Sequence, residues 1–554
     1  MKIQVSELIV KYMERLGIDT IFGMPGAHIL PVYDSLYDST IQSILAKHEQ
    51  GAAFMAGGYN RASGRIGACI TTAGPGATNL VTGIANAYAD KQPILIITGE
   101  APTYIFGKGG LQESSGEGGS IDQSALFKGI TRYNKVVERT DYLENVLNQA
   151  SKILLSESAG PVLLSFPYNV QKELVDDSIL DNIKTEKHYC SLNRDSQSVD
   201  AVARMIQQAQ KPVIIAGYGC IKSGAQAKLT ELSELLNIPV TSSLKGKGAI
   251  SEQSGLSLGS LGVTSYSHAY KYIEEFSDLV IFLGAAFNER TSYIWDKKLL
   301  EGKKIIQIDI DYSQLEKVFK ADIAIQGDIG EVLTAVLDNI KNSPSGNHRK
   351  DYQAVSEAQD ETSQTNAAIF KSKFSLIETF FLKLEEHFPE NITVFDDNII
   401  FAQNFFNVAS SNRYYPNSGV SSLGHAIPAA IGAQFADKKT TFAVLGDGGF
   451  QMCCMEIMTA VNYGIPLNII MFNNSTMGLI RKNQFQQYQE RFINCDFVNP
   501  DYEALAKSFG INHQRIVDKE DLNELFARTD FSNAINLIEI MIDKDAFPNY
   551  SSRR

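Results

Sequence analysis

The hydrophobic positions of this chain follow two alternating patterns along most of its length. Near the N-terminus, apolar residues recur at helical spacing, as Val5, Leu8, Ile9 and Tyr12 show. Beyond them, short unbroken apolar runs such as GACITTAG and PILIITG alternate with longer helix-like stretches. Unbroken apolar runs are typical of strands that are covered on both faces, so the alternation predicts parallel sheets between layers of helices. We therefore predict an α/β protein.

The same alternation occurs three times, and polar stretches separate the three segments. Runs such as KPVIIAGYG and DLVIFLGAA indicate strands in the second segment, and TTFAVLGDGGF and AINLIEIMI indicate strands in the third. Residues 342–366 are polar and lack apolar periodicity, which is typical of a linker. The pattern predicts three consecutive doubly wound parallel-sheet domains, over residues 1–170, 190–340 and 367–554.

Composition restricts the partners of the protein more than its fold. A chain of 554 residues is long enough for several domains. The net charge of −13 is spread along the sequence and forms no basic stripe that would bind nucleic acid. The six cysteines include no Cys-x-x-Cys pair, so their spacing predicts neither a zinc site nor a disulfide framework. No leader-like or membrane-length apolar stretch occurs, and we expect a cytoplasmic protein without membrane or nucleic-acid partners.

The strongest chemical signal lies in the third segment, where polar residues end two successive strands. Asp447, flanked by Gly446, Gly448 and Gly449, follows one apolar run, and Asn474 follows the next. Successive parallel strands end at one edge of the sheet, where ligands bind in open α/β folds. Oxygen ligands of this kind suit Mg²⁺, and glycines let backbone N–H groups approach phosphate oxygens. Gly-Asp-Gly alone is more often a tight turn, but together with the asparagine it favours a metal that binds a diphosphate.

These motifs resemble the signature of thiamine-diphosphate-dependent enzymes. The resemblance covers the whole chain and implies pyrimidine-binding, central and diphosphate-binding domains in that order. In that family the metal is bound by the aspartate, the second asparagine and a backbone carbonyl two residues later, which correspond here to Asp447, Asn474 and Thr476. The resemblance therefore implies thiamine diphosphate and Mg²⁺ as cofactors.

The resemblance also assigns a role to Glu49, which follows Lys47-His48 at the start of a helix-like stretch. It matches the glutamate that contacts the aminopyrimidine ring of the cofactor and stabilises the tautomer that acts as base. On its own, such a residue would more often be a solvated glutamate in a first helical turn. In the family this glutamate completes the diphosphate site of another subunit, so the resemblance implies at least a homodimer and leaves a tetramer open.

Leu423 matches the position of the bulky residue that holds the cofactor in its bent shape, although a core leucine would look the same. The cofactor-binding residues implied by the resemblance are Pro25, Gly26, Glu49, Gly74, Pro75, Asn79, Ser421, Ser422, Leu423, Gly446, Asp447, Gly448, Gly449, Asn474, Met477 and Gly478.

The first segment resembles acetolactate synthase in detail, through FGMPG, ILPVYD and TAGPGATNLVTG. The resemblance implies that the enzyme decarboxylates pyruvate and joins the two-carbon unit to a second 2-keto acid, which gives 2-acetolactate. Arg290 aligns with the arginine that binds the carboxylate of the second substrate, although a surface salt bridge would look the same. The catalytic glutamine is Gln112 or Gln123, depending on the register of the glycine-rich stretch 107–123.

Several positions depart from the acetolactate synthase pattern. Ala286 replaces an arginine, and residues 261–265 differ from the motif near the flavin, so both argue against a bound FAD. Asn483 replaces the tryptophan that shapes the pocket for the second substrate. His28 stands where the synthases carry a small residue, and either a packed side chain or a substrate contact is compatible with that position. The third segment is also similar to carboxyethylarginine synthase, so a specialised-metabolite carboligase with another donor or acceptor is the alternative.

Two hypotheses from other classes are weaker. A binding or regulatory protein on an inactive enzyme scaffold would be expected to lack cofactor residues, but Glu49, Asp447 and Asn474 are all present. A nucleotide-dependent α/β enzyme would carry a Walker-type or dinucleotide-binding glycine motif after a strand, and the sequence contains neither.

Overall fold

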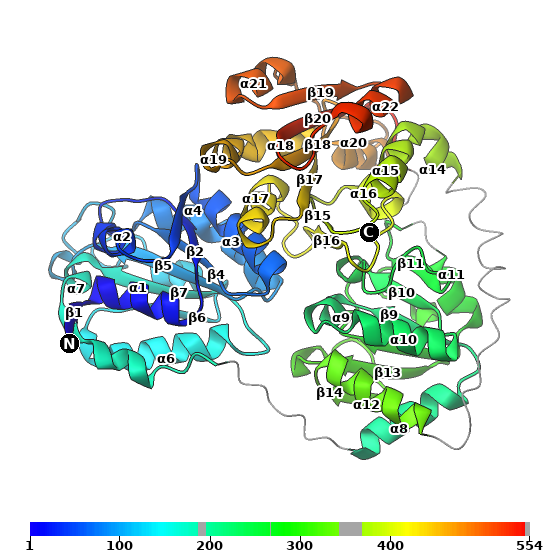
Figure 1. Cartoon of the computed structure of the whole chain (residues 1–554), viewed down its shortest axis with the longest axis horizontal. Helices are drawn as coiled ribbons and strands as arrows, with labels where there is room; N and C mark the ends of the chain where they lie inside the picture. The colour runs from blue at the N-terminus through cyan, green and yellow to red at the C-terminus, as the bar shows by residue number, and fades with distance from the viewer. Residues whose placement is uncertain (187–195, 266–267, 343–367, 549–554) are drawn as a thin grey trace.

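A computed structural model describes residues 1–186, 196–265, 268–342 and 368–548. The linker that we predicted at residues 342–366 therefore lies outside the described residues, apart from Asn342. Three α/β units are visible in Figure 1, coloured blue to cyan, green, and yellow to red along the chain.

The first unit contains a six-stranded parallel sheet in the order β3-β2-β4-β5-β7-β6. Its strands are β2 (Thr20–Gly23), β3 (Gln42–Leu45), β4 (Gly67–Thr71), β5 (Ile94–Glu100), β6 (Tyr133–Val136) and β7 (Val162–Pro167). Its helices are α1 (Val5–Arg15), α2 (Leu30–Tyr37), α3 (Glu49–Ser63), α4 (Pro75–Ala89), α5 (Gln123–Phe127), α6 (Leu143–Leu154) and α7 (Tyr168–Gln171). Every residue of β4, β5 and β7 is buried, as expected for strands covered on both faces.

The third unit repeats this topology, with the strand order β16-β15-β17-β18-β20-β19. Its strands are β15 (Ile392–Asp396), β16 (Arg413–Pro416), β17 (Thr440–Gly446), β18 (Leu467–Asn473), β19 (Asn512–Ile516) and β20 (Ile535–Met541). Its helices are α14 (Ala368–Lys373), α15 (Ser375–His387), α16 (Ile400–Phe405), α17 (Ala426–Ala436), α18 (Asp447–Cys453), α19 (Ile457–Tyr463), α20 (Gly478–Gln487), α21 (Tyr502–Phe509) and α22 (Lys519–Arg528). The first and third units are thus built on one plan.

The central unit has the order β11-β10-β9-β12-β13-β14, which is the strand order of dinucleotide-binding folds. Its strands are β9 (Pro212–Ala216), β10 (Val240–Ser243), β11 (Ser257–Leu261), β12 (Leu279–Leu283), β13 (Lys304–Asp309) and β14 (Ile323–Gln326). Its helices are α8 (Ser196–Gln208), α9 (Tyr218–Lys222), α10 (Gln226–Leu236), α11 (Ala269–Lys271) and α12 (Ile329–Lys341). Three consecutive parallel-sheet units confirm the predicted fold class.

The first unit continues beyond residue 170. Strand β1 (Lys2–Gln4) pairs antiparallel with β8 (Leu174–Asp176), and a 3-10 helix over Asp177–Asn182 follows. Leu180 and Ile183 are buried in the same core as α1. We therefore propose that the first domain includes these residues, whereas the other predicted limits stay predictions. Among the helices within the described ranges, none has both the length and the apolar character of a membrane span.

The first and third units are joined by helices α3 and α17, which occupy equivalent places in the two sheets. A Cβ atom at Gly58 would overlap the carbonyl group of Ala429, and a Cβ atom at Gly432 would overlap that of Met55. The two contacts are reciprocal. Met55 and Gly58 are three residues apart on α3, and they meet two residues of α17 that are also three apart. The helices therefore pack about a local pseudo-twofold axis, at a distance that only glycine permits.

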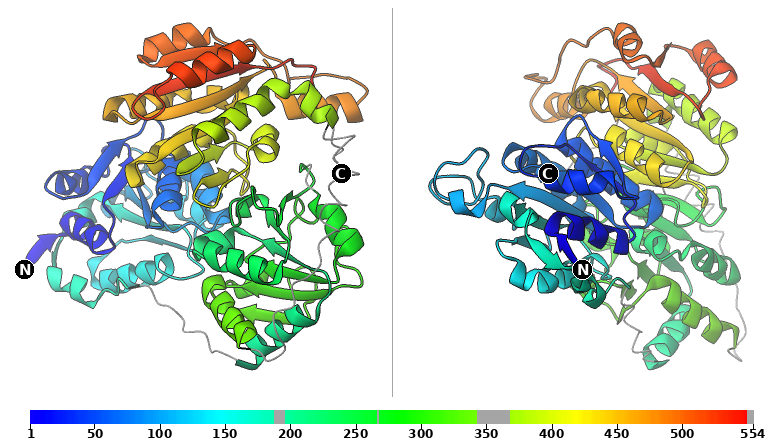
Figure 2. Two further views of the ribbon diagram at one scale, coloured as in Figure 1. Left: turned by 45° about the vertical axis from the view of Figure 1, so that its right-hand side comes forward. Right: turned by 60° about the vertical axis from the view of Figure 1, so that its left-hand side comes forward.

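A buried polar junction ties all three units together. Arg61 of the first unit forms an ion pair with Asp90, which also pairs with Lys245 of the central unit. The hydroxyl group of Tyr415, in the third unit, donates a hydrogen bond of 2.7 Å to the carbonyl oxygen of Arg61. Figure 2 shows the three units from two further sides and, on the right, the light-blue loop 107–123 that projects from the first unit.

We expect Gly58→Ala to destabilise the protein by about 1–3 kcal/mol or more, because the added methyl group has no space between the helices. The midpoint of the thermal transition measures the effect. Gly129→Ala is the matched control, since a Cβ atom there meets nothing within 4 Å. Equal midpoints for the two variants would contradict the proposed close packing of α3 and α17.

Candidate active site

The predicted site residues lie at the carboxyl edges of two sheets, where the strand order changes direction. In the first unit this point lies between β2 and β4, and in the third unit between β15 and β17. Ligands of open α/β folds bind in the crevice at such a switch point. Pro25, Gly26, Gly74 and Pro75 follow β2 and β4, whereas Asp447 follows β17. The two units thus carry two groups of predicted residues, one in each crevice.

In the first unit, Glu49 is the first residue of α3 and is 7% exposed. Asn79, another predicted residue, donates a hydrogen bond of 2.9 Å from Nδ2 to Oε2 of Glu49. The start of α3 is fixed by Glu456 of the third unit, whose carboxylate accepts hydrogen bonds from the backbone N–H groups of Lys47 and His48 at 3.1 and 2.9 Å. The position of Glu49 is therefore set by a contact between the units, and the sequence analysis missed Glu456.

The structure separates the two candidate glutamines. Gln123 is fully buried, and its Nε2 donates hydrogen bonds to the hydroxyl groups of Thr98 and Ser165 at 2.9 and 3.3 Å. Gln112 is half-buried beside Gly74, and its Oε1 accepts a hydrogen bond of 3.4 Å from the Thr72 hydroxyl group. Gln123 therefore belongs to the core, whereas Gln112 lies at the crevice, as a catalytic role requires.

In the third unit, Asp447 is the first residue of α18 and is almost fully buried. Its Oδ2 accepts hydrogen bonds from the backbone N–H of Ser475 at 2.7 Å and from Nδ2 of Asn499 at 2.8 Å. The Oδ1 of Asn474 accepts a hydrogen bond from the N–H of Thr476 at 3.3 Å, so these two predicted metal ligands lie in one turn, which Ser475 bonds to Asp447. Burial raises the pKa of Asp447, and a bound cation would offset that cost.

The remaining predicted residues of the third unit surround this turn. A Cβ atom at Gly448 would lie 2.7 Å from Sδ of Met477, and one at Gly478 would lie 2.9 Å from Nδ2 of Asn474. At Gly446, by contrast, the nearest atom would be 3.9 Å away. Asp447 and this turn together provide a carboxylate, an amide oxygen and backbone N–H groups, which fits Mg²⁺ with a diphosphate.

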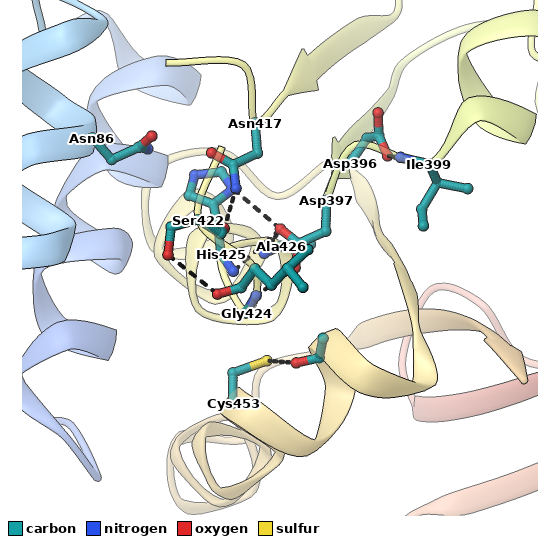
Figure 3. Close-up of polar contacts among 12 residues, drawn as sticks. Asn86, Asp396, Asp397, Ile399, Asn417, Ser422, Gly424, His425, Ala426 and Cys453 are labelled. Atoms are coloured by element: carbon teal, nitrogen blue, oxygen red, sulfur yellow. Dashed lines mark hydrogen bonds and ion pairs between the residues drawn. The ribbon is translucent and has the colours of Figure 1, made fainter. Parts of the chain in front are cut away.

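Asp397, which the sequence analysis missed, shapes the loop that holds Ser421, Ser422 and Leu423. Figure 3 shows its carboxylate against the first turn of α17, where it accepts hydrogen bonds from the N–H groups of Gly424, His425 and Ala426 at 2.7, 3.2 and 3.0 Å. A Cβ atom at Gly449 would lie 3.3 Å from Oδ2 of Asp397. The loop 421–424 therefore lies over the glycine turn. In the sequence, Asp397 could have been recognised as a candidate because two consecutive acidic residues follow an apolar run.

Within one chain the two groups do not meet. Asp447 begins α18, and Glu456, which contacts the start of α3 beside Glu49, ends the 3-10 helix Cys454–Glu456 that follows. A seven-residue helix followed by three 3-10 residues spans roughly 15 Å. Glu49 and Asp447 of the same chain therefore lie at opposite ends of this segment.

Arg290, in the central unit, is half-buried. Its Nη1 is buried without a hydrogen-bond partner among the described residues. Burial raises the pKa of Asp396 to about 6, and the nearby charge of Arg290 counteracts this rise. Because Asp396 precedes Asp397 in the chain, Arg290 lies near the crevice of the third unit. An unpartnered guanidinium nitrogen there suits a carboxylate ligand.

The loop 261–265, which differs from the flavin motif, is bonded to the third unit. The Thr264 hydroxyl group donates a hydrogen bond of 3.1 Å to Oε1 of Gln403, and Nδ2 of Asn404 donates one of 2.9 Å to the carbonyl oxygen of Thr264. Ala286 is exposed. The central unit thus contacts α16 directly at the place where the resemblance locates the flavin.

The turn beside Asp447 in one unit and the buried carboxylate at a helix start in an equivalently folded unit are the features expected of an enzyme that binds a diphosphate cofactor between two domains. Family models agree: the N-terminal TPP binding domain of thiamine pyrophosphate enzymes matches residues 3–125, their central domain matches residues 199–336, and their C-terminal TPP binding domain matches residues 398–540. The chain belongs to the thiamine pyrophosphate enzyme family, as the sequence motifs predicted.

Curated relatives narrow the comparison further. The chain is 33% identical to a probable acetolactate synthase large subunit of Methanocaldococcus jannaschii, over 97% of this chain and 92% of the relative. It is 32% identical to the corresponding protein of Methanococcus aeolicus, with the same coverage. It is 30% identical to the acetolactate synthase isozyme 2 large subunit of Escherichia coli, over 97% of this chain and 95% of the relative. The resemblance to acetolactate synthases is thereby confirmed over nearly the full length.

We expect the stability to fall with rising pH partly because of Asp397. Burial raises its pKa from 3.8 to about 7, so the folded protein holds this proton more tightly than the unfolded chain does. The stability that the Asp397 proton contributes is fully present below the ordinary pKa and is lost as the pH rises through about 7. Over this range the free energy of unfolding falls by at most about 1.4 kcal/mol per pH unit.

Thermal midpoints at about pH 5 and about pH 8 check this expectation. Asp397→Asn should show a smaller loss between the two values than the unaltered protein, whereas Asp38→Asn, a change at an exposed carboxyl group, should not. The same loss in all three proteins would contradict the role of Asp397.

Proposed function

We propose that this protein is a thiamine-diphosphate-dependent carboligase that decarboxylates pyruvate and joins the two-carbon unit to a second 2-keto acid to form 2-acetolactate. The observation that carries the proposal is the pairing of Glu49 with Asn79 in one crevice and of Asp447 with the Asn474 turn in the other. The acetolactate synthase names of the relatives support the substrate class.

Each side chain would have a definite task. Bound thiamine diphosphate supplies the electron sink for decarboxylation and for carbon–carbon bond formation. Glu49, held by Asn79 at the start of α3, would share a proton with the ring nitrogen of the aminopyrimidine. Asp447, Asn474 and the carbonyl oxygen of Thr476 would hold Mg²⁺. Arg290 would bind the carboxylate of the second substrate, and Gln112 would face the substrates from the first unit.

We also infer that the complete site forms between subunits, so that the enzyme is at least a homodimer. Roughly 15 Å of helix separates Asp447 from Glu456, which contacts the start of α3 beside Glu49 in the same chain. Large apolar side chains around the third-unit crevice remain exposed, including Met452 at 58%, Met455 at 57% and Ile480 at 48%. A partner's first unit would cover such a patch.

The proposal does not require FAD. The contacts of Thr264 with α16 and the replacement of an arginine by Ala286 support this, because both lie where the resemblance locates a flavin. The described cysteines are free thiols, which suits the reducing environment of the cytoplasm. No partner beyond small 2-keto acids and a second copy of the chain is needed.

One observation favours the alternative carboligase. Asn483 of α20 stands where the synthase pattern has tryptophan, and its buried Oδ1 has no hydrogen-bond partner among the described residues. An acceptor substrate with a hydrogen-bond donor would satisfy this oxygen. Acceptors other than a second pyruvate, in the manner of a specialised-metabolite carboligase, would then be preferred.

With thiamine diphosphate, Mg²⁺ and pyruvate, we expect 2-acetolactate as the main product. Mass spectrometry identifies the product, and Glu49→Gln should reduce its formation by about 10²-fold or more because a proton-sharing carboxyl group is lost. Lys11→Gln, at a surface ion pair with Glu7, serves as a control that should keep full activity. Cofactor binding without turnover of pyruvate would reject the acetolactate assignment and favour the alternative.

If each site combines Glu49 of one subunit with Asp447 of another, two inactive variants can restore activity when they form a dimer together. Glu49→Gln and Asp447→Asn chains, given different tags and purified as a mixed dimer, combine one doubly altered site with one intact site. We expect the mixed dimer to recover about half of the unaltered activity, whereas each variant alone stays inactive. If both halves of a site came from one chain, the mixed dimer would stay inactive as well.

A further inference from the structure

His28 lies at the crevice of the first unit, in the turn between β2 and α2, and its backbone is fixed from several sides. Its N–H donates a hydrogen bond of 3.3 Å to the Thr72 hydroxyl group, and its carbonyl oxygen accepts one of 2.7 Å from Nε2 of Gln171. Gly99 of β5 packs against it so closely that a Cβ atom there would overlap this carbonyl group. The position of His28 is therefore defined by the sheet itself.

The imidazole ring, in contrast, has no hydrogen-bond partner for one of its nitrogens. His28 is 8% exposed, and its buried Nδ1 has no partner among the described residues. An unsatisfied buried polar atom is unfavourable, so a histidine with only a packing role would normally be hydrogen-bonded. An unsatisfied imidazole nitrogen on a backbone that is fixed in place is a feature expected at a ligand site.

His28 is continuous with a polar strip along the crevice. The Thr72 hydroxyl group accepts the hydrogen bond from the His28 N–H and donates one to Oε1 of Gln112 at 3.4 Å. Gln112 in turn packs against Gly74, and its backbone lies in the left-handed region with φ of 54°. Thr72 thus links His28, which has an unsatisfied imidazole nitrogen, to Gln112, which has a left-handed backbone, on the same sheet edge as the predicted cofactor residues Gly74 and Pro75.

We propose that His28 is a substrate-binding residue, whose imidazole donates a hydrogen bond to the carbonyl oxygen of the acceptor 2-keto acid. The inference rests on the proposed function and adds a contact to its acceptor site. When the new carbon–carbon bond forms at the acceptor carbonyl carbon, the π electron pair moves to the carbonyl oxygen, which then takes a proton from water. A fixed donor beside this oxygen binds it more strongly as the negative charge develops.

The role predicts which step responds to a substitution. Without the hydrogen bond, decarboxylation of the first pyruvate continues, but transfer to the acceptor slows, and the two-carbon unit is released as acetaldehyde instead. Acetaldehyde should therefore rise relative to acetolactate, and kcat/KM for acetolactate formation should fall by about 10²-fold, the usual effect of losing one such donor. A packing role alone would not change the ratio of the two products.

His28→Phe removes the hydrogen bond and keeps an aromatic ring, whereas His28→Gln keeps an N–H donor. We expect His28→Phe to retain the thermal midpoint and the affinity for thiamine diphosphate, measured by fluorescence quenching, and to shift the products toward acetaldehyde. His28→Gln should recover part of the acetolactate. His387→Phe is the matched control, because His387 packs among phenylalanine rings of the third unit.

An unchanged product ratio in His28→Phe would overturn the proposal. So would a parallel loss of thermal midpoint, cofactor affinity and acetolactate formation that His28→Gln fails to recover, because that pattern indicates a structural role. If the unaltered enzyme released neither CO₂ nor acetolactate from pyruvate, the proposed function itself would fall and the acceptor contact with it. That outcome is recognised before any substitution is made.

Discussion

The close packing of α3 against α17 is the constraint on which the rest of the molecule depends. Gly58 and Gly432 let the two helices approach until backbone meets backbone, and this fixes the first unit against the third. Because the helices are equivalent elements of two equivalent sheets, the contact also fixes the direction in which each crevice faces. The 3-10 helix that follows α18 then contacts the start of α3 through Glu456, whereas Asp447 begins α18, so the two groups of predicted residues lie at opposite ends of this segment.

Buried carboxylates fix the backbone of the loops that carry the predicted site residues. Glu456 binds the N–H groups before α3, and Asp397 binds those at the start of α17. Burial raises the pKa of both carboxyl groups, whereas the backbone hydrogen bonds at the helix starts lower it and so favour the charged form. Glu49 follows the first of these helix starts, and Leu423 precedes the second. Their placement depends on these acidic residues more than on their own packing.

The fold class and the family could be predicted from the sequence because their signals are local. Unbroken apolar runs define parallel strands, and the rule that such strands end at one edge brings Asp447 and Asn474 together. Asn499 and Glu456 could not be found in this way, since Glu456 acts on a residue 408 positions away and Asn499 on one 52 positions away. Asp397 follows the end of β15, so the same rule could have indicated it. The choice between Gln112 and Gln123 also needed the fold, because spacing does not say which side chain enters the core.

Three of the departures from the acetolactate synthase pattern lie away from the residues that would bind the metal. Glu49, Asp447 and Asn474 are present, whereas His28, Ala286 and Asn483 lie where the acceptor or a flavin would be met. The central sheet has the strand order of dinucleotide-binding folds, yet fold alone does not assign a ligand. Its loop at Thr264 is bonded to α16. The cofactor supplies the electron sink for any acceptor substrate. A change of acceptor therefore requires new protein contacts only around the carbonyl group of that acceptor. Among the described residues, His28, Arg290 and Asn483 each have an unpartnered buried polar atom that would be available for such contacts.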